Sequence, residues 1–409
     1  MPEVGFGNLL AVLAIAFAAP LLLGFAPRVR VPAVVLEIAA GIVLGPSVLG
    51  WIEADLVVRI VAVLGLAFLL FLAGLEIDVH RLRGRLLRTA LLGYVITLAV
   101  GLAAGGAFKA AGWVDSSLLL AITLSATSLG LVVPVLKDAG QAGTQLGQTT
   151  IAASSVADFA AVLLLSLLFS TMAGGSTGSR LVLLGMFVAL VVLAAVVVAV
   201  SGRSMRLGAV LERLQDTTAE IRVRAAVLLL IGFVVLAERF GLESILGAFL
   251  AGAVVGLLDA DSSSHPHFRV KLEAIGFGFL IPVFFVASGL RLDIRGLIDS
   301  PPALLRVPLF LLALLAARGL PALLYVPSVG RRPAVAAALL QATSLPFIVT
   351  ATQIGVAVGL MEPVTAAGLV CAGLLSVLVF PAAALGLVRR PGVPAEITGP
   401  DEAPVQERM

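Results

Sequence analysis

The sequence predicts an all-α polytopic membrane protein with about 13 transmembrane helices, arranged as two inverted six-helix repeats with two crossing broken helices. Three observations lead to this fold class. Sixty per cent of the 409 residues are hydrophobic and only 12% are charged, whereas soluble domains are about half apolar and about a quarter charged. The apolar residues form runs of about 20, long enough to cross the ~30 Å core of a bilayer. Three sequence blocks of the first half recur in the second half in the same order.

The apolar runs define thirteen expected spans. Each must be a helix, or a broken helix buried in protein, because unsatisfied backbone groups cannot face lipid. Lys and Arg gather in one set of loops, 19 against 7 in the opposite set. Since cytoplasmic loops carry this excess, we expect a plasma (inner) membrane protein with its N-terminus outside and its C-terminus cytoplasmic. The spans cover residues 8–25, 32–50, 56–75, 86–108, 116–136, 146–170, 180–201, 222–238, 243–258, 270–290, 302–327, 333–357 and 362–388.

The recurring blocks set the order of the repeats. Six spans in each copy, joined by a seventh span, place the second copy upside down, an arrangement common in alternating-access transporters. The paired blocks are GIVLG (41–45) with GAVVG (252–256), FLAGLEIDV (71–79) with FVASGLRLDI (285–294), and ATSLGLVV (126–133) with ATSLPFIV (342–349).

The repeats and the charge pattern divide the chain into four regions. A first inverted repeat with the linking helix is expected over residues 1–201, followed by a cytoplasmic connection over 202–221. A second inverted repeat is expected over 222–388. The tail over 389–409 is rich in Pro and charge, a composition typical of disordered segments.

One carboxylate lies well inside an expected span. Asp158 stands in the sixth span among small and apolar residues, where a charge costs ~2.5–3.5 kcal/mol on insertion scales and by default marks a functional site. The preceding span is interrupted by Thr127 and Ser128, with Gly130 and Pro134 close behind. Such an interrupted span points to a transporter's binding site. A carboxylate that holds either a proton or a cation could exchange one for the other, because burial raises its pKa and a nearby cation lowers it.

Hydroxyl groups near Asp158 offer the oxygen ligands that alkali cations prefer. Ser154 and Ser155 precede Asp158 by four and three residues, so they can share its helix face. Thr343 and Ser344 lie at the equivalent break in the second half. Any of these hydroxyls can instead bond back to its own helix, as Ser and Thr usually do in membrane helices.

Two of the other charged residues within the expected spans bear on the site. Arg318 can compensate charge by pairing with Asp158 or with the carbonyl groups of a broken helix, or it can contact the ion. Glu37 lies near the cytoplasmic end of the second span, where it is expected to belong to the helix panel or to an entry funnel.

The chain resembles the membrane domain of the monovalent cation:proton antiporter-2 family, which includes sodium/proton exchangers and Kef-type potassium efflux systems. The resemblance covers about residues 8–388. It implies a homodimer with a panel of spans one to three and seven to ten at its interface. It also implies that a core of spans four to six and eleven to thirteen carries the ion by an elevator-like movement. The resembling blocks are residues 36–52, 68–79, 124–138, 247–256 and 284–293.

The resemblance also implies roles for individual residues. Two positions depart from the family pattern: Ala157 stands where related antiporters often have Asn, Asp or Gln, and Ser128 stands where they often have Asp. These departures leave the choice between Na⁺ and K⁺ open. The family's functional positions fall on Asp158 (cation binding), Thr127 and Ser128 (unwound helix), Ser154 (hydroxyl) and Arg318 (basic residue).

We therefore expect a secondary antiporter that exchanges Na⁺ or K⁺ for H⁺, one for one and without net charge movement. Its substrates would be the cation, held as a transported metal ion at Asp158, and protons; we expect no cofactor and no nucleic acid. A Kef-type potassium pathway gated by a separate subunit and an organic-anion symporter on the same plan are the alternatives. An enzyme is not expected, because no H-E-x-x-H motif occurs and all three histidines lie in expected loops.

Overall fold

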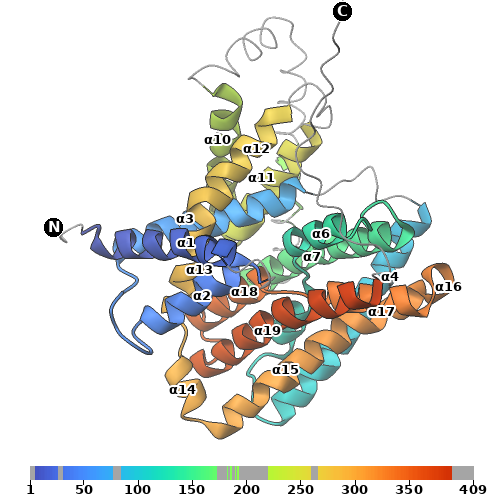
Figure 1. Cartoon of the computed structure of the whole chain (residues 1–409). Helices are drawn as coiled ribbons and strands as arrows, with labels where there is room; N and C mark the ends of the chain where they lie inside the picture. The colour runs from blue at the N-terminus through green and yellow to red at the C-terminus, as the bar shows by residue number, and fades with distance from the viewer. Residues whose placement is uncertain are drawn as a thin grey trace, which may run out of the picture.

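The computed structural model describes residues 5–25, 31–76, 84–172, 220–258 and 266–388, with a few single positions between 182 and 192. Every regular element in these residues is a helix (Figure 1). Nine helical segments of the described chain are long and apolar enough to cross a membrane, and two shorter apolar helices accompany them. The predicted all-helical, multi-pass membrane fold is confirmed.

Some of the expected regions lie outside the described residues. The seventh span, expected over 180–201, lies almost wholly outside the described residues. The same is true of residues 202–219 of the expected cytoplasmic connection and of the expected disordered tail, 389–409.

One group of helices, which we call the panel, combines the beginning of the chain with its middle (blue and yellow, upper left in Figure 1). Within it α3 packs against α11 and α13, while α2 packs against α1 and α13. Its elements are α1 (Gly7–Phe25), α2 (Ala33–Leu44), α3 (Leu56–Leu75), α10 (Ile221–Arg239), α11 (Ser244–Leu258), α12 (Pro266–Ile275), the π-helical η1 (Gly276–Leu280) and α13 (Ile281–Leu290).

A second group, which we call the core, contains the helices of the predicted site. In it α4 packs against α5 and α7, and α19 packs against α15, α17 and α18. Its elements are α4 (Gly84–Ala110), α5 (Ser117–Ser125), α6 (Leu129–Asp138), α7 (Gln145–Met172), α14 (Ile294–Ile298), α15 (Pro301–Gly319), the 3₁₀ helix η2 (Leu320–Tyr325), α16 (Val326–Val329), α17 (Arg331–Gln341), α18 (Pro346–Ala357) and α19 (Pro363–Val388).

Helix backbones touch inside the panel where the recurring sequence blocks meet. A Cβ atom on Gly41 would overlap the Val286 carbonyl oxygen and crowd Gly289, and one on Gly252 would overlap the Phe71 carbonyl oxygen. Only glycine, which lacks Cβ, allows an approach this close. The first block of each half therefore packs against the second block of the other half.

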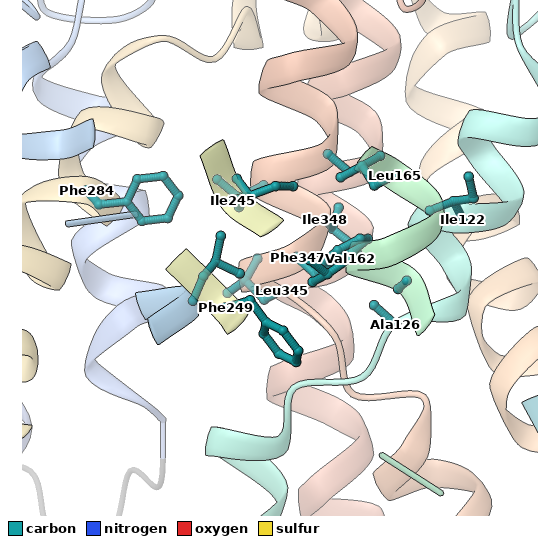
Figure 2. Close-up of a cluster of buried hydrophobic side chains, with 14 of the residues drawn as sticks. Ile122, Ala126, Val162, Leu165, Ile245, Phe249, Phe284, Leu345, Phe347 and Ile348 are labelled. Carbon is teal, nitrogen blue, oxygen red and sulfur yellow. The ribbon is translucent and has the colours of Figure 1, made fainter. Parts of the chain in front are cut away.

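An apolar layer lies between the panel and the core. Helix α11 of the panel packs against α7 of the core, and the ring centroids of Phe249 and Phe159 are 5.9 Å apart. Such a layer contributes burial but few directional bonds. Figure 2 shows Ile245, Phe249 and Phe284 of the panel together with Ile122, Val162, Leu165, Phe347 and Ile348 of the core.

Besides a bond from Arg295 on α14 to the Val48 carbonyl oxygen over 3.2 Å, two hydrogen bonds between described residues join the panel to the core. The side-chain amide of Gln353 on α18 donates to the Ser288 hydroxyl on α13 over 2.8 Å. The backbone N–H of Glu243, just before α11, lies 3.4 Å from the Ser166 hydroxyl on α7. Both bonds lie near the helix ends that the charge pattern places outside.

Candidate functional site

Two core helices are broken, and the breaks cross each other. Helix α5 ends at Ser125 and α6 begins at Leu129, while α17 ends at Gln341 and α18 begins at Pro346. The backbone N–H of Ser128 in the first break donates to the carbonyl oxygen of Thr343 in the second over 2.9 Å. The predicted pair of crossing broken helices is confirmed. Gly130 and Pro134, which follow the interruption in the sequence, lie inside α6.

Local chemistry explains where each helix stops. Pro346 has no N–H to continue a helix and disfavours the α conformation of the residue before it. Leu345, with φ −140° and ψ −56°, is outside the helical conformation. In the first break Ala126 is extended, with φ −80° and ψ 156°. The Ser125 hydroxyl donates to the Ile122 carbonyl over 2.8 Å, a side-chain bond that competes with helix continuation.

Asp158, from α7, completes the N-terminal end of half-helix α6. Its carboxylate accepts the backbone N–H of Thr127 over 3.0 Å and that of Leu129 over 3.4 Å. Ser128, at the helix cap, makes no side-chain cap bond. The first N–H groups of a helix lack internal partners and carry a partial positive charge, so this end stabilises an anion. The carboxylate is therefore held in place by backbone groups and forms no ion pair with any residue that the structure describes.

Arg318 is 1% exposed and connects the two breaks. Its Nε donates to the Thr127 hydroxyl over 2.8 Å and lies 3.3 Å from the Gln341 carbonyl oxygen. Its Nη2 also donates to Thr127, and its Nη1 lies 3.3 Å from the Thr97 hydroxyl. Of the partners expected for Arg318, the structure shows a carbonyl of a broken helix rather than the Asp158 carboxylate.

The Thr127 hydroxyl is fully used by this network. It donates its proton to the Gln341 carbonyl over 2.7 Å and accepts from the Arg318 guanidinium. A hydroxyl has one proton and two lone pairs. With two guanidinium N–H groups on its oxygen, Thr127 has no lone pair left for a cation.

The other predicted hydroxyls differ in their partners. Ser155 donates to Ile151 over 3.0 Å and Thr343 to Leu339 over 3.2 Å. Both bond back to their own helix and keep their lone pairs. The hydroxyls of Ser154 and Ser344 are buried and have no hydrogen-bond partner in the described part of the chain. Buried polar atoms are nearly always paired, so an unpaired one calls for an explanation.

Sequence reasoning missed Ser376 on α19. Its hydroxyl accepts the Ser344 N–H over 3.2 Å and lies 2.7 Å from the Gly373 carbonyl. Ser376 thus contacts the second break as Asp158 contacts the first, each from the last helix of its half. The third pair of blocks, 126–133 and 342–349, is offset by 216 positions and places the counterpart of Asp158 at Leu374, two residues before Ser376.

A cavity of about 560 Å³ lies between the panel and the core and reaches this site. Thr127, Ser128 and Asp158 belong to its core wall, and Glu37 and Glu76 belong to its panel wall. Most other lining residues are apolar, among them Phe249, Phe285 and Phe347.

Glu76, one residue beyond the end of α3, contributes negative charge at the cavity. Burial raises the pKa of its carboxyl to about 7, against the opposing effect of Arg269. Its Oε2 atom is buried with no hydrogen-bond partner in the described chain.

The family model described as "Sodium/hydrogen exchanger, transmembrane" matches residues 13–386. The Bacillus subtilis protein named "Putative Na(+)/H(+) antiporter YjbQ" is 32% identical over 370 residues, 87% of this chain and 58% of that protein. The Na⁺/H⁺ antiporter of Enterococcus hirae is 32% identical over 269 residues, 65% of this chain and 68% of that protein. This chain therefore spans little more than half the length of the B. subtilis relative.

A solved structure shares the fold. It is the sodium proton antiporter MjNhaP1 of Methanocaldococcus jannaschii at pH 8, with a TM-score of 0.65 and 17% identity. The match covers 93% of this chain and 97% of that chain.

Proposed function

Because the chain belongs to the sodium/hydrogen exchanger family, we propose that it exchanges a monovalent cation, Na⁺ or K⁺, for protons across a membrane. The observation that carries the proposal is the position of Asp158. Its buried carboxylate lies at the crossing of two broken helices and on the wall of a cavity. Family members are transporters, and we infer no enzymatic role.

Exchange follows from competition for one carboxylate. When Asp158 is protonated, its oxygens no longer offer a charge to a cation; when a cation binds, the proton leaves. One cation replaces one proton, so the charge of the site is the same in both loaded states. With a single carboxylate at the crossing and Arg318 held in its own network, we propose one-for-one, electroneutral exchange.

The cation ligands are the Asp158 carboxylate and the hydroxyls with free oxygen lone pairs. Ser154, one helical turn before Asp158, and Ser344, in the second break, have buried and unpaired hydroxyls. Ser128 lines the cavity. Ser155 and Thr343 keep lone pairs for a secondary contact. Alkali cations prefer such oxygen ligands.

Thr127 and Arg318 form the frame that holds the two breaks together. The guanidinium binds a hydroxyl of the first break and a carbonyl of the second. Losing the Arg318 guanidinium altogether would remove both bonds and let the half-helices shift relative to Asp158. We therefore assign Arg318 and the Thr127 hydroxyl to positioning rather than to cation binding.

Transport would occur by an elevator movement of the core against the panel. The cavity lies beside Glu76 and the first residues of α2, at the face that the Lys and Arg distribution assigns to the cytoplasm, with the N-terminus outside. The apolar layer and the Gln353–Ser288 bond close the other face. This arrangement is an inward-open state of a plasma-membrane protein.

The packing of the glycines supports inverted repeats over 1–201 and 222–388. The contact of Gly41 with Val286 is matched by the contact of Gly252 with Phe71, which is what a two-fold relation between the halves requires. Exchanging the conformations of the two halves would generate the outward-open state. We further propose that two copies of the chain form a homodimer in the lipid bilayer, with the panel at the interface.

The test is dissipation of a pH gradient in proteoliposomes that contain the full chain, with Li⁺, Na⁺, K⁺ and Rb⁺ compared side by side. We expect Na⁺ or K⁺ to dissipate the pH gradient. Asp158→Asn should abolish this dissipation in a correctly folded protein. Retained exchange in that variant would overturn the site. Cation flux driven by a membrane potential alone would overturn electroneutrality, and single-channel currents would favour a gated pathway.

A further inference from the structure

Glu37 is a buried carboxylate on the panel that has no part in the exchange mechanism described above. It lies in α2, whose other residues are apolar or small, and is 5% exposed. No hydrogen bond or ion pair joins it to any residue in the described ranges. Its side chain lines the same cavity as Asp158, from the opposite wall.

An unpartnered buried carboxylate is costly. Desolvating a charge costs several kcal/mol unless a partner or a hydrogen bond compensates it, and buried polar groups in folded proteins are nearly always paired. Glu37 has no compensating residue in the described chain but has direct access to a cavity. A cation that enters this cavity would reach the Glu37 carboxylate and compensate its charge.

The chemistry of the walls limits that ligand to a small cation. The lining residues around Glu37 include Val34, Leu69 and Phe285, which offer no hydrogen-bonding groups. The charged side chains that line the cavity are the carboxylates Glu37, Glu76 and Asp158. Among its described lining residues the cavity has three acids and no Lys or Arg, a lining that repels anions and concentrates cations.

We propose that Glu37 is a further binding contact for the transported cation, which captures the ion in the cavity and passes it to Asp158. This inference rests on the proposed antiport. The panel carries Glu37 and the core carries Asp158, so the two carboxylates separate when the core moves. Glu37 therefore acts on ions arriving from the cavity face and not on ions arriving from the other face.

This asymmetry gives the test. Exchange is measured in inside-out and right-side-out membrane vesicles, which present the cavity face and the opposite face to the added cation. For Glu37→Gln we expect the half-saturating cation concentration to rise roughly three- to tenfold at the cavity face, the loss that one carboxylate several ångströms from the ion would cause. The value at the opposite face and the maximal rate should stay near wild type.

Matched variants separate this role from a structural one. Glu53→Gln removes an exposed panel carboxylate outside the cavity and should change neither face. Glu37→Asp keeps the charge and should recover most of the affinity. An equal change at both faces, or no change at either, would overturn the role of Glu37. Asp158→Asn in the same vesicles tests the antiport itself. If Asp158→Asn abolishes exchange while Glu37→Gln leaves both faces unchanged, the antiport stands and only the role of Glu37 is wrong.

A second measurement needs no variant. A lipophilic carbodiimide adds as a whole molecule to a protonated carboxyl in an apolar site, and mass spectrometry of the wild-type protein locates the added mass. We expect labelling at Glu37 and a fall in that labelling when Na⁺ or K⁺ is present. Labelling of Glu37 that no alkali cation reduces would overturn the proposed contact.

Discussion

Replacing Thr127 by valine tests whether this hydroxyl positions the site or binds the cation. Valine has nearly the shape of threonine but no hydroxyl, so the substitution leaves the packing in place. It removes the 2.7 Å bond to the Gln341 carbonyl and the main acceptor of the Arg318 guanidinium. Arg318 keeps the Thr97 hydroxyl and the Gln341 carbonyl, each at 3.3 Å.

The size of the effect follows from these bonds. A neutral hydrogen bond contributes about 1 kcal/mol net, and one to a charged group about 1.5–3 kcal/mol. Since Arg318 is not left without partners, we expect the free energy of unfolding to fall by about 2–4 kcal/mol. A lone pair already occupied by the guanidinium cannot be lost as a cation ligand, so the half-saturating cation concentration should change little.

The assay pairs thermal unfolding of the full-length protein in detergent with cation-dependent exchange in proteoliposomes. Thr127→Val should lower Tm by several degrees with cation affinity near wild type. Thr127→Ser, which keeps the hydroxyl, should behave as wild type. Ser128, the next residue, makes no side-chain cap bond, so Ser128→Ala should leave Tm unchanged and weaken cation binding. A Thr127→Val variant with unchanged Tm and weakened cation binding would refute the assignment.

Two further predictions follow from contacts outside the site. Gln353→Leu removes the bond to Ser288 that closes the face opposite the cavity; losing about 1 kcal/mol should shift the inward-to-outward ratio about fivefold. A lower half-saturating cation concentration at the outer face would show this, and an unchanged or higher one would contradict it. Asp55→Ala removes the N-cap of α3, a 2.9 Å bond from the Val58 N–H, and should cost about 1 kcal/mol at pH 7. That N–H lowers the pKa of Asp55, so the contribution is present above its unfolded pKa and is lost as the pH falls through the folded value. The Tm values of the wild-type protein and of Asp55→Ala should therefore converge in acid, and a difference in Tm that persists there would count against the cap.

Much of the fold followed from local properties of the sequence. Apolar runs of about 20 residues can satisfy their backbone in lipid only as helices, which is why each expected span that falls within the described residues coincides with a helix or a broken helix. Pro346 marks the second break because it has no N–H to continue a helix, and the first break follows Ser125, whose hydroxyl bonds back to the Ile122 carbonyl. Asp158 stood out because the cost of a buried charge depends on its immediate surroundings.

Partners of individual side chains could not be predicted in this way. Ser155 bonds back to its own helix, whereas the hydroxyl of the adjacent Ser154 is left unpaired. The difference depends on which neighbouring helix each side chain faces. Ser376 was missed because its role comes from a contact with Ser344 on another helix. Nothing in the residues around either position distinguishes these outcomes.

The sequence by itself determined that this is a polytopic helical protein with one central carboxylate between two broken helices. The tertiary structure decided which oxygens around that carboxylate are free. It joined Thr127 to Arg318 across 191 positions of sequence, which occupied a hydroxyl that the sequence had offered to the cation. It also placed Glu37 and Asp158 on opposite walls of one cavity. The physical reason is that helix formation and insertion cost are local, whereas hydrogen-bond partners and cavities exist only where distant segments pack together.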